Sequence, residues 1–435
     1  MTVNRLLLLA ALTVCLIPAG ASGQDLEAVA PPPYASPPSC PAYTSDGTTP
    51  IGIVRYLSDD ALQGRFAGSA GERCAGEFIA DRFEELGLEP AGGTGWFQTL
   101  ELTSAAQPHA PAGVGRNVLA LLPGSDPDLA GSVVVVGAHY DHLGFGEFGS
   151  TGEAGEVHNG ADDNASGVAA MLEAARILSE GPRPARSILF IAFTGEELGL
   201  IGSSHYVRNP AFPLARTLAM VNLDMVGRLG EEAMIVYGMG TAPEWEDLVP
   251  EANRDTAIPL AYEAAGYGPS DHTSFYAADI PVLHFFTNVH RDYHRETDDW
   301  PNIDVAGLER VARFTAEVAG RLADRPTRLT LVPGVGDPGE RAGGYGAWLG
   351  TVPDFTPVDT GVLLAGVTAG GPADEADLRK GDVIVRIGTH DVEDLQGMTD
   401  ALSAHVPGQE VTIWFLRDER RMTTTAILGD RADRP

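Results

Sequence analysis

Four short runs of apolar residues, rich in β-branched and aromatic side chains, recur through the middle of the chain. They are Val133–Val136, Ile188–Phe193, Leu218–Leu223 and Pro281–Phe286. Because these runs lack the alternation of a half-exposed strand, each predicts a strand that is buried on both faces. Segments with helical spacing lie around them, at Arg73–Leu86, Gly167–Ser179 and Asn302–Leu322. Strands that alternate with helices predict an α/β sheet covered on both faces.

A second pattern begins after a stretch rich in proline and glycine, Pro326–Gly344. The residues beyond it predict short strands and one helix. The strands are expected at Val362–Val367, Asp382–Ile387, Val411–Leu416 and Met422–Leu428, and the helix at Leu395–Ala404. We therefore expect a large domain over residues 51–325, a linker over 326–340 and a small β-rich domain over 341–430.

The N-terminus has the features of a signal peptide. Arg5 precedes the apolar run Leu6–Ile17, and small residues follow up to Gly23. The run is shorter than the roughly 20 residues that a membrane-spanning helix needs. We expect a signal peptide over residues 1–23, a proline-rich arm over 24–50, no membrane span, and a secreted or periplasmic protein. In such an oxidising compartment Cys40 and Cys74 are candidates for a disulfide, with two free thiols as the alternative.

The charge composition excludes one class of binding partner. The chain has 29 Lys and Arg residues against 60 Asp and Glu residues, a net charge of −31. A surface this acidic repels phosphate backbones, so nucleic acid is excluded as a partner. The hydrophobic share of 44% and the charged share of 20% are ordinary for a soluble globular protein.

Residues with metal-binding side chains follow the predicted strands, where sites in α/β sheets form. The segments are His139–His142, Gly160–Gly167, Thr194–Gly199, Asp224 and Tyr293–His294. Two imidazoles and three carboxylates can hold two divalent ions if one carboxylate bridges them. Such a pair can polarise a carbonyl and generate hydroxide, with one further carboxylate as general base. The adjacent Glu196 and Glu197 offer a base and a ligand.

These motifs resemble the co-catalytic di-zinc aminopeptidase family, which includes bacterial leucyl aminopeptidase, glutamate carboxypeptidase and the transferrin receptor. The matching segments are HYDHLG, GADDNASG, FTGEELGLIGS, NLDMVG and the late YH, in the family's order. The resemblance covers about Ile51–Arg325. It implies a zinc exopeptidase fold with a mixed, mostly parallel central sheet, two zinc ions per chain and peptide substrates.

The resemblance also implies a set of five metal ligands. His139 and Asp224 would bind the first zinc, and Glu197 and His294 the second. Asp163 would bridge both, chosen over its neighbour because the family's bridging residue lies four residues before a glycine.

Further roles follow from the same resemblance. Glu196 would be the general base, and Tyr293 would stabilise the oxyanion. Asp141 would orient the nearby imidazole, as a carboxylate partner of a metal-bound histidine does. Asp271 and His272 would lie on the substrate side or behind the ligands.

Other polar residues near these motifs are expected to be structural. His142, His158 and His205 are expected on loops or helix surfaces, His284 in the core, Asp162 as a helix cap, and Asp298 and Asp299 in a solvated turn.

The small C-terminal domain resembles a PDZ domain. Its central segment is GVLLAGVTAGGPADEADLRKGDVIVRIG, and the carboxylate-binding loop would be YGAWLG. Such domains add a peptide as a strand and hold its C-terminus on backbone N–H groups. We expect Trp348, Leu349 and Gly350 to bind peptide or protein C-termini, although Trp348 replaces the usual glycine. A domain that only packs on the catalytic domain stays an alternative.

The sequence thus predicts a secreted zinc metallopeptidase. It would be an aminopeptidase that uses two zinc ions, a bridging hydroxide and Glu196 as general base. Three alternatives remain open: a glutaminyl-cyclase-like zinc transferase, which typically works with one zinc, a carboxypeptidase-type preference, and a non-catalytic peptide-binding scaffold that uses the PDZ domain.

Overall fold

The structure is a computed structural model. It describes residues 40–42, 47–102, 113–146, 149–336, 347–354, 358, 360–368, 370–392, 397–398, 401–402, 404–417 and 420–430. The predicted signal peptide, residues 1–23, lies outside the described residues, as does most of the proline-rich arm. Among the described residues, the helices are all too short or too polar to cross a membrane.

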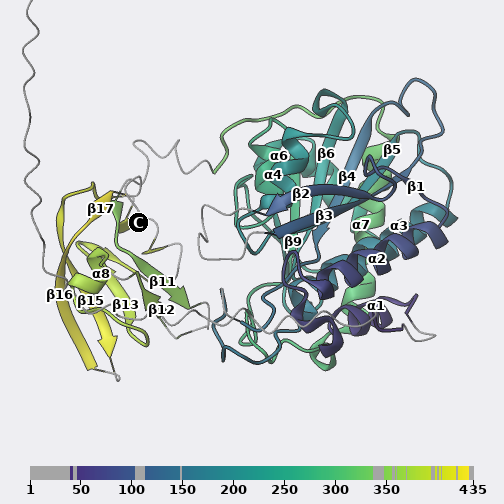
Figure 1. Cartoon of the computed structure of the whole chain (residues 1–435). Coiled ribbons are helices and arrows are strands. Elements are labelled where there is room, and N and C mark those ends of the chain that lie inside the picture. Colours follow the sequence, from purple (N-terminus) through teal and green to yellow (C-terminus); the bar gives the residue numbers. More distant parts are fainter. Residues whose placement is uncertain are drawn as a thin grey trace, which may run out of the picture. The chain divides into compact units, whose positions relative to one another are not determined.

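A nine-stranded mixed sheet forms the centre of the large domain (Figure 1). The strand order is β1-β3-β5-β4-β6-β9-β7-β8, with β2 paired to β3. Strands β5, β4, β6 and β9 are parallel, whereas β3 and β7 run antiparallel to β5 and β9. The strands are β1 (Glu89–Pro90), β2 (Phe97–Leu102), β3 (Gly113–Leu122), β4 (Val133–His139), β5 (Ser187–Phe193), β6 (Thr217–Leu223), β7 (Met234–Tyr237), β8 (Leu260–Tyr262) and β9 (Val282–Phe286).

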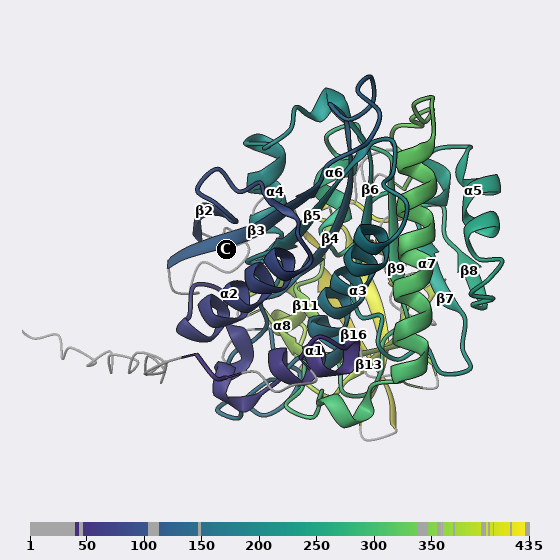
Figure 2. The same ribbon diagram turned by 90° about the vertical axis from the view of Figure 1, so that its right-hand side faces the viewer.

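The predicted α/β fold with helices on both faces of a mixed sheet is confirmed. Every residue of β4, β5 and β6 is buried. Alternate side chains enter two separate cores, so Val134 lies in one and Val135 in the other. Helices α1, α2, α3 and α7 cover the first core, while α4 and α6 cover the second (Figure 1, Figure 2).

Side chains cap the starts of three helices. Thr49, Ser69 and Asp304 accept hydrogen bonds from backbone N–H groups at the starts of α1, α2 and α7. The helix predicted at Asn302–Leu322 therefore begins after Asp304 as α7, and Trp300–Asn302 forms a separate 3₁₀ turn. The α-helices are α1 (Pro50–Leu57), α2 (Ala70–Glu85), α3 (Gly167–Glu180), α4 (Ile201–Arg208), α5 (Trp245–Ala252), α6 (His272–Tyr276) and α7 (Val305–Asp324).

A disulfide joins Cys40, which precedes α1, to Cys74 within α2. Of the two states that the sequence left open for these cysteines, the structure shows the bonded one. The bond ties the start of the described chain to a helix of the first core.

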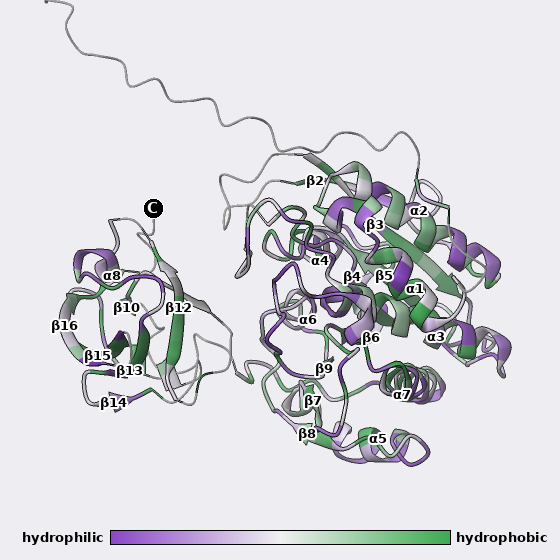
Figure 3. Cartoon of the chain, turned by 90° about the horizontal axis from the view of Figure 1, so that it is seen from below, coloured by the Kyte–Doolittle hydropathy of each residue, from purple (hydrophilic) through white to green (hydrophobic). Residues whose placement is uncertain are grey.

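The small domain has a six-stranded antiparallel sheet and a hydrophobic core of its own, which includes Leu364, Ile384 and Phe415. Strand β12 is hydrophobic along its length (Figure 3). Half of the predicted helix Leu395–Ala404 lies outside the described residues, and residues 397, 398, 401 and 402 are helical. The elements are β10 (Ala347–Trp348), β11 (Thr351–Asp354), β12 (Val362–Val367), α8 (Pro372–Glu375), β13 (Val383–Ile387), β14 (His390–Asp391), β15 (Glu410–Arg417), β16 (Arg420–Ile427) and β17 (Gly429–Asp430).

Candidate metal centre

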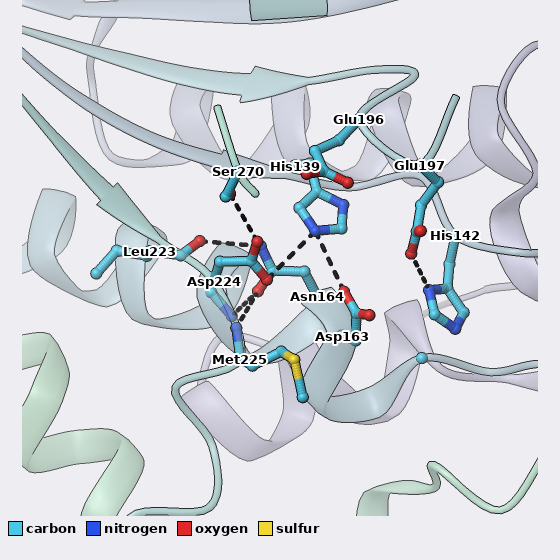
Figure 4. Close-up of polar contacts among 12 residues, drawn as sticks. His139, His142, Asp163, Asn164, Glu196, Glu197, Leu223, Asp224, Met225 and Ser270 are labelled. Atoms are coloured by element: carbon cyan, nitrogen blue, oxygen red, sulfur yellow. Dashed lines mark hydrogen bonds and ion pairs between the residues drawn. The ribbon is translucent and has the colours of Figure 1, made fainter. Parts of the chain in front are cut away.

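The side chains predicted to bind metal come from the carboxyl ends of neighbouring parallel strands. His139 is the last residue of β4, and Asp224 follows β6 directly. Glu197 lies in the turn after β5, and His294 in the loop after β9. Asp163 lies in the turn Ala161–Ser166, just before α3, and its own backbone angles are not helical. Because parallel strands end at one edge of the sheet, these side chains meet there. Figure 4 shows four of them, His139, Asp163, Glu197 and Asp224.

One group of donors surrounds the imidazole of His139. Its Nε2 atom lies 3.2 Å from Oδ1 of Asp163 and 3.4 Å from Oδ1 of Asp224. Side chains of this chemistry and spacing could hold a metal ion. The hydroxyl of Ser270 donates a hydrogen bond of 2.7 Å to the other oxygen of Asp224, which leaves Oδ1 turned toward the imidazole (Figure 4).

A second group surrounds the other oxygen of Asp163. Nε2 of His294 lies 3.2 Å from Oδ2 of Asp163 and 3.3 Å from Oε2 of Glu197. The two oxygens of Asp163 therefore face different imidazoles. In this orientation one carboxylate could bridge two ions.

His142 lies against the second group, which corrects the expectation of a loop-surface residue. Its ring is buried, and Nδ1 lies 2.8 Å from Oε1 of Glu197. His142, Asp163 and Glu197 also have the spacing of a metal-binding group. Two imidazoles are thus candidates for the second ion, because His294 lies 3.2 Å from Asp163 and 3.3 Å from Glu197, while His142 lies 2.8 Å from Glu197 and within 4.8 Å of a ligand atom of Asp163.

Comparison with protein families agrees with this geometry. Residues 117–319 match the family model of Peptidase family M28, and residues 352–428 match that of the PDZ domain. The chain carries an M28 peptidase domain followed by a PDZ domain.

Curated relatives match parts of the chain. Aminopeptidase YwaD of Bacillus subtilis is 34% identical over 194 residues, 44% of this chain and 39% of the relative. Leupeptin-inactivating enzyme 1 of Streptomyces exfoliatus is 28% identical over 323 residues, 69% of this chain and 65% of the relative. The chain thus spans less than two thirds of the length of either relative.

Solved structures share the fold of the M28 domain. An aminopeptidase from Aneurinibacillus sp. strain AM-1 has a TM-score of 0.50 at 21% identity, covering 67% of this chain and 97% of that one. Glutaminyl cyclase of Bacteroides thetaiotaomicron has a TM-score of 0.52 at 20% identity, covering 65% and 99%. At these identities the likeness concerns the fold alone.

Asp141 of the M28 domain positions both the imidazole and the glutamates. Nδ1 of His139 lies 3.2 Å from the backbone oxygen of Asp141 and 3.7 Å from its Oδ1. The same carboxylate accepts backbone N–H groups of Glu196 and Glu197, at 3.1 and 3.4 Å. Asp141 therefore fixes the turn after β5 as well as the ring after β4.

The charges of the centre stabilise one another. Burial opposes the charge of Asp163, but hydrogen bonds to His139 and His294 outweigh it and hold its pKa well below the usual range. Burial also opposes the charge of Glu197, yet the pKa is about 2 because of His294. The pKa of His294 is raised well above its ordinary value despite burial, chiefly by Glu197. Positive charge is thus favoured between these carboxylates, so the donor set fits cations.

The remaining predicted site residues lie beside the ligands. The ring of Tyr293 stacks on that of His294, with ring centroids 3.9 Å apart. Burial raises the pKa of the Tyr293 phenol, which stays protonated. Asp271 is buried, and burial raises its pKa to about 7. His272 stacks on His284, with ring centroids 4.4 Å apart.

Two aspartates expected to be a helix cap and part of a solvated turn are buried instead. Asp162 accepts the backbone N–H of Gly227 rather than one of α3. Asp298 accepts backbone N–H groups of Asp162 and Asp163. His158 is also buried, at 2.7 Å from the hydroxyl of Ser150. His284 is buried next to Asn222, as expected for a core histidine.

Arg65 and Asn164 support the centre and were not singled out from the sequence. The buried guanidinium of Arg65 donates to backbone oxygens of Leu57, Tyr140, Asn159 and Gly160. Burial lowers its pKa to about 10, so it remains charged at neutral pH. Asn164 donates to the oxygen of Leu223 and accepts from Met225, on either side of Asp224 (Figure 4).

In the PDZ domain, backbone hydrogen bonds hold the predicted peptide-binding loop. The backbone oxygens of Leu349 and Gly350 accept N–H groups of Ala373 and Thr368, at 2.7 and 2.8 Å. Gly350 has a φ of 80°, a conformation that favours glycine. The ring of Trp348 lies against Gly350 and Gly371, so this tryptophan packs across the loop.

Proposed function

We propose that the M28 domain is a zinc aminopeptidase with two ions. The observation that carries this proposal is the orientation of Asp163, whose oxygens lie 3.2 Å from His139 on one side and 3.2 Å from His294 on the other. His139 and Asp224 would hold one ion, and Glu197 and His294 the other. The curated relative named aminopeptidase YwaD supports the reaction, and the match to Peptidase family M28 supports a peptidase.

Zinc ions bound there would polarise the peptide carbonyl and lower the pKa of water. The chain's own residues would move the protons. Glu196 would accept a proton from the attacking water on a carboxylate oxygen and deliver it to the departing amine. The phenol of Tyr293 would donate a hydrogen bond to the carbonyl oxygen as negative charge develops on it. Asp141 would hold the backbone N–H of Glu196 and so fix its position.

The charge at the centre favours substrates with a free amino terminus. Burial and the neighbouring charge of Asp224 raise the pKa of both Glu196 and Asp271. A bound α-ammonium group would relieve the repulsion among these carboxyl groups, whereas a terminal carboxylate would add to it. Nearby arginines are engaged, Arg65 by backbone oxygens and Arg228 by two aspartates. This supports an aminopeptidase over a carboxypeptidase.

The decisive experiment compares free and N-acetylated aminoacyl p-nitroanilides, with zinc analysis of the same sample. We expect hydrolysis of the free compounds alone, loss of activity on chelation, recovery with zinc, and two zinc ions per chain. Conversion of N-terminal glutamine to pyroglutamate with one zinc per chain would indicate the cyclase reaction instead. Absence of any reaction with two zinc ions bound would indicate a scaffold.

We also propose that the protein works in an oxidising compartment, secreted or periplasmic. The disulfide between Cys40 and Cys74 supports this, because such bonds persist outside the reducing cytosol. N-terminal sequencing of the extracellular or periplasmic protein should show cleavage close to Gly23. A chain that retains residues 1–23 and stays in the cytoplasm would contradict the proposal.

The PDZ domain would bind C-termini of longer peptide substrates at Leu349 and Gly350. Tethering raises the local concentration of a peptide near the metal centre. The first part of the predicted linker over residues 326–340 packs on the M28 domain, where the N–H of Val332 bonds to the oxygen of Thr241 and the N–H of Gly266 to that of Val335. We expect deletion after Gly336, which keeps these contacts, to lower kcat/KM for a decapeptide while sparing a dipeptide amide. Equal losses for both substrates would overturn this role. The Gly350→Ala variant of the full chain provides a second test, because φ at this position favours glycine.

A further inference from the structure

Three ligand-bearing segments of the M28 domain meet at one group of charges, of which the three aspartates are buried and the arginine and histidine partly buried. The group consists of Asp162, Arg228, His290, Asp292 and Asp298, and is called the Asp298 cluster below. At its centre, Oδ2 of Asp298 accepts the backbone N–H groups of Asp162 and Asp163, at 2.9 and 3.0 Å. Oδ1 accepts a hydrogen bond of 2.7 Å from Nη2 of Arg228. The carboxylate of Asp298 thus holds the backbone of the bridging ligand directly.

Arg228 links this contact to the segment that carries His294. Its Nη1 atom donates to Oδ2 of Asp292 at 2.7 Å. Oδ1 of Asp292 in turn accepts the hydroxyl of Thr297 at 2.8 Å. A single planar guanidinium therefore connects residues 292 and 298, on either side of His294 in the sequence.

Asp162 makes a second connection across the cluster. Its Oδ1 accepts the backbone N–H of Gly227 at 2.7 Å, three residues beyond Asp224. Its Oδ2 lies 3.1 Å from Nε2 of His290, on the loop that leads to His294. The segments around Asp163, Asp224 and His294 therefore share one set of contacts.

The cluster affects the two ion positions unequally. His139 and Asp224 extend directly from buried strands, so the sheet fixes them. His294 lies in a loop, and Asp163 lies in a segment whose backbone N–H is bonded to the cluster. A buried ion pair contributes little net stability compared with apolar residues, but charge-assisted hydrogen bonds fix geometry. The cluster should therefore act on the geometry of the second ion.

We propose that Asp298 is a positioning residue that, together with Arg228, sets the distance between Asp163 and His294 and thereby the affinity for the second zinc ion. This inference rests on the proposed two-ion function. Asp298 does not touch substrate or metal. Its effect passes through the backbone of Asp163 and the loop of His294.

The test is zinc titration of the metal-free full chain against a chelating indicator, with kcat and KM at limiting and saturating zinc. In Asp298→Asn, one acceptor for the two N–H groups remains and the ion pair is lost. We expect the dissociation constant of the second ion to rise about 10–100-fold. That of the first should change less than about threefold, and saturating zinc should restore kcat with KM unchanged. Asp298→Ala, which removes every acceptor, should weaken the second ion further.

Two more variants separate positioning from folding. Arg228→Lys keeps the charge but loses the two-pronged contact, and should also weaken the second ion selectively. Glu173→Gln removes a surface pair of the same 2.7 Å length with Arg176 and should change neither constant. Suppose that the wild-type chain binds two ions, but that Asp298→Asn and Arg228→Lys leave both dissociation constants unchanged or weaken the two ions equally. The inference would then be wrong, and the proposed function would stand. Full activity of wild type with one ion would overturn the proposed function together with the inference.

Discussion

The two halves of the metal centre are built differently. In the strand half, His139 and Asp224 continue directly from β4 and β6, whose residues are all buried. In the loop half, Glu197 and His294 lie on turns whose backbone is held by side chains. Asp141 binds the N–H of Glu197, and Thr151 binds the oxygen of Tyr293. A sheet can thus place one set of ligands, while the other depends on individual contacts. Substitutions away from the ligands should therefore affect the loop half first.

The largest effect should come from substitution of Glu196 and Glu197, of which only Glu197 belongs to the loop half. Glu196→Gln should keep both ions yet lower kcat about 10²–10⁴-fold, because the general base is lost. Glu197→Gln should instead release the second ion. Zinc content and kcat of both variants at equal zinc concentration give the comparison. Equal zinc loss in both variants would show that the roles of the glutamates are assigned wrongly.

A smaller difference should separate the two imidazoles of the loop half. His294 lies 3.2 Å from Asp163 and 3.3 Å from Glu197, whereas His142 lies 2.8 Å from Glu197 and only within 4.8 Å of Asp163. His142→Gln should weaken the second ion about 10–100-fold, as loss of an outer partner does, and His294→Gln should weaken it more. Zinc titration of each variant measures this. If His142→Gln proves the more damaging, His142 is the ligand and His294 its partner.

The smallest effect concerns pH and the turn that carries the glutamates. Glu72 of α2 bonds to the hydroxyl of Thr194, just before that turn, and to the N–H of Gly68. Burial raises its pKa from 4.5 to about 7, although these hydrogen bonds oppose the shift. The folded state therefore binds the proton more tightly than the unfolded chain. The stability that Glu72 contributes is present below about pH 4.5 and lost as the pH rises through about 7.

Replacement of this carboxyl should reduce the pH dependence of stability. Between pH 5 and pH 8, the melting temperature of Glu72→Gln should change less than that of the wild type at saturating zinc. Glu77→Gln, on the exposed side of the same helix, is the matched control. An identical change in wild type and Glu72→Gln would contradict the assignment.

The sequence was sufficient for the fold because its signals were local. Strands buried on both faces appear as uninterrupted apolar runs, and β4, β5 and β6 lie where those runs predicted them. The ligand types after each strand pointed to a metal centre for the same reason. Asp163 and Asp162 are adjacent and chemically identical, so their different orientations depend on contacts with distant segments.

Burial of charged residues could not be predicted in this way. Asp298 reads as part of a solvated turn, but its partners Arg228 and Asp162 are 70 and 136 positions away. Arg65 likewise binds backbone oxygens more than 90 positions further on. His142 offered one usable signal, since it lies three residues after His139 in the same motif. That signal could not distinguish a ligand from a neighbour of one.

The backbone of the segment from Asn159 to Asp163 is held by hydrogen bonds to two charged side chains. The cation of Arg65 binds its backbone oxygens, and the anion of Asp298 binds its backbone N–H groups. Ordering a free segment costs about 1–2 kcal/mol of conformational entropy per residue. In this segment the entropy is lost when the protein folds and not when it binds metal. An arriving ion therefore meets a bridging carboxylate that is already in place, and more of its binding energy appears as affinity.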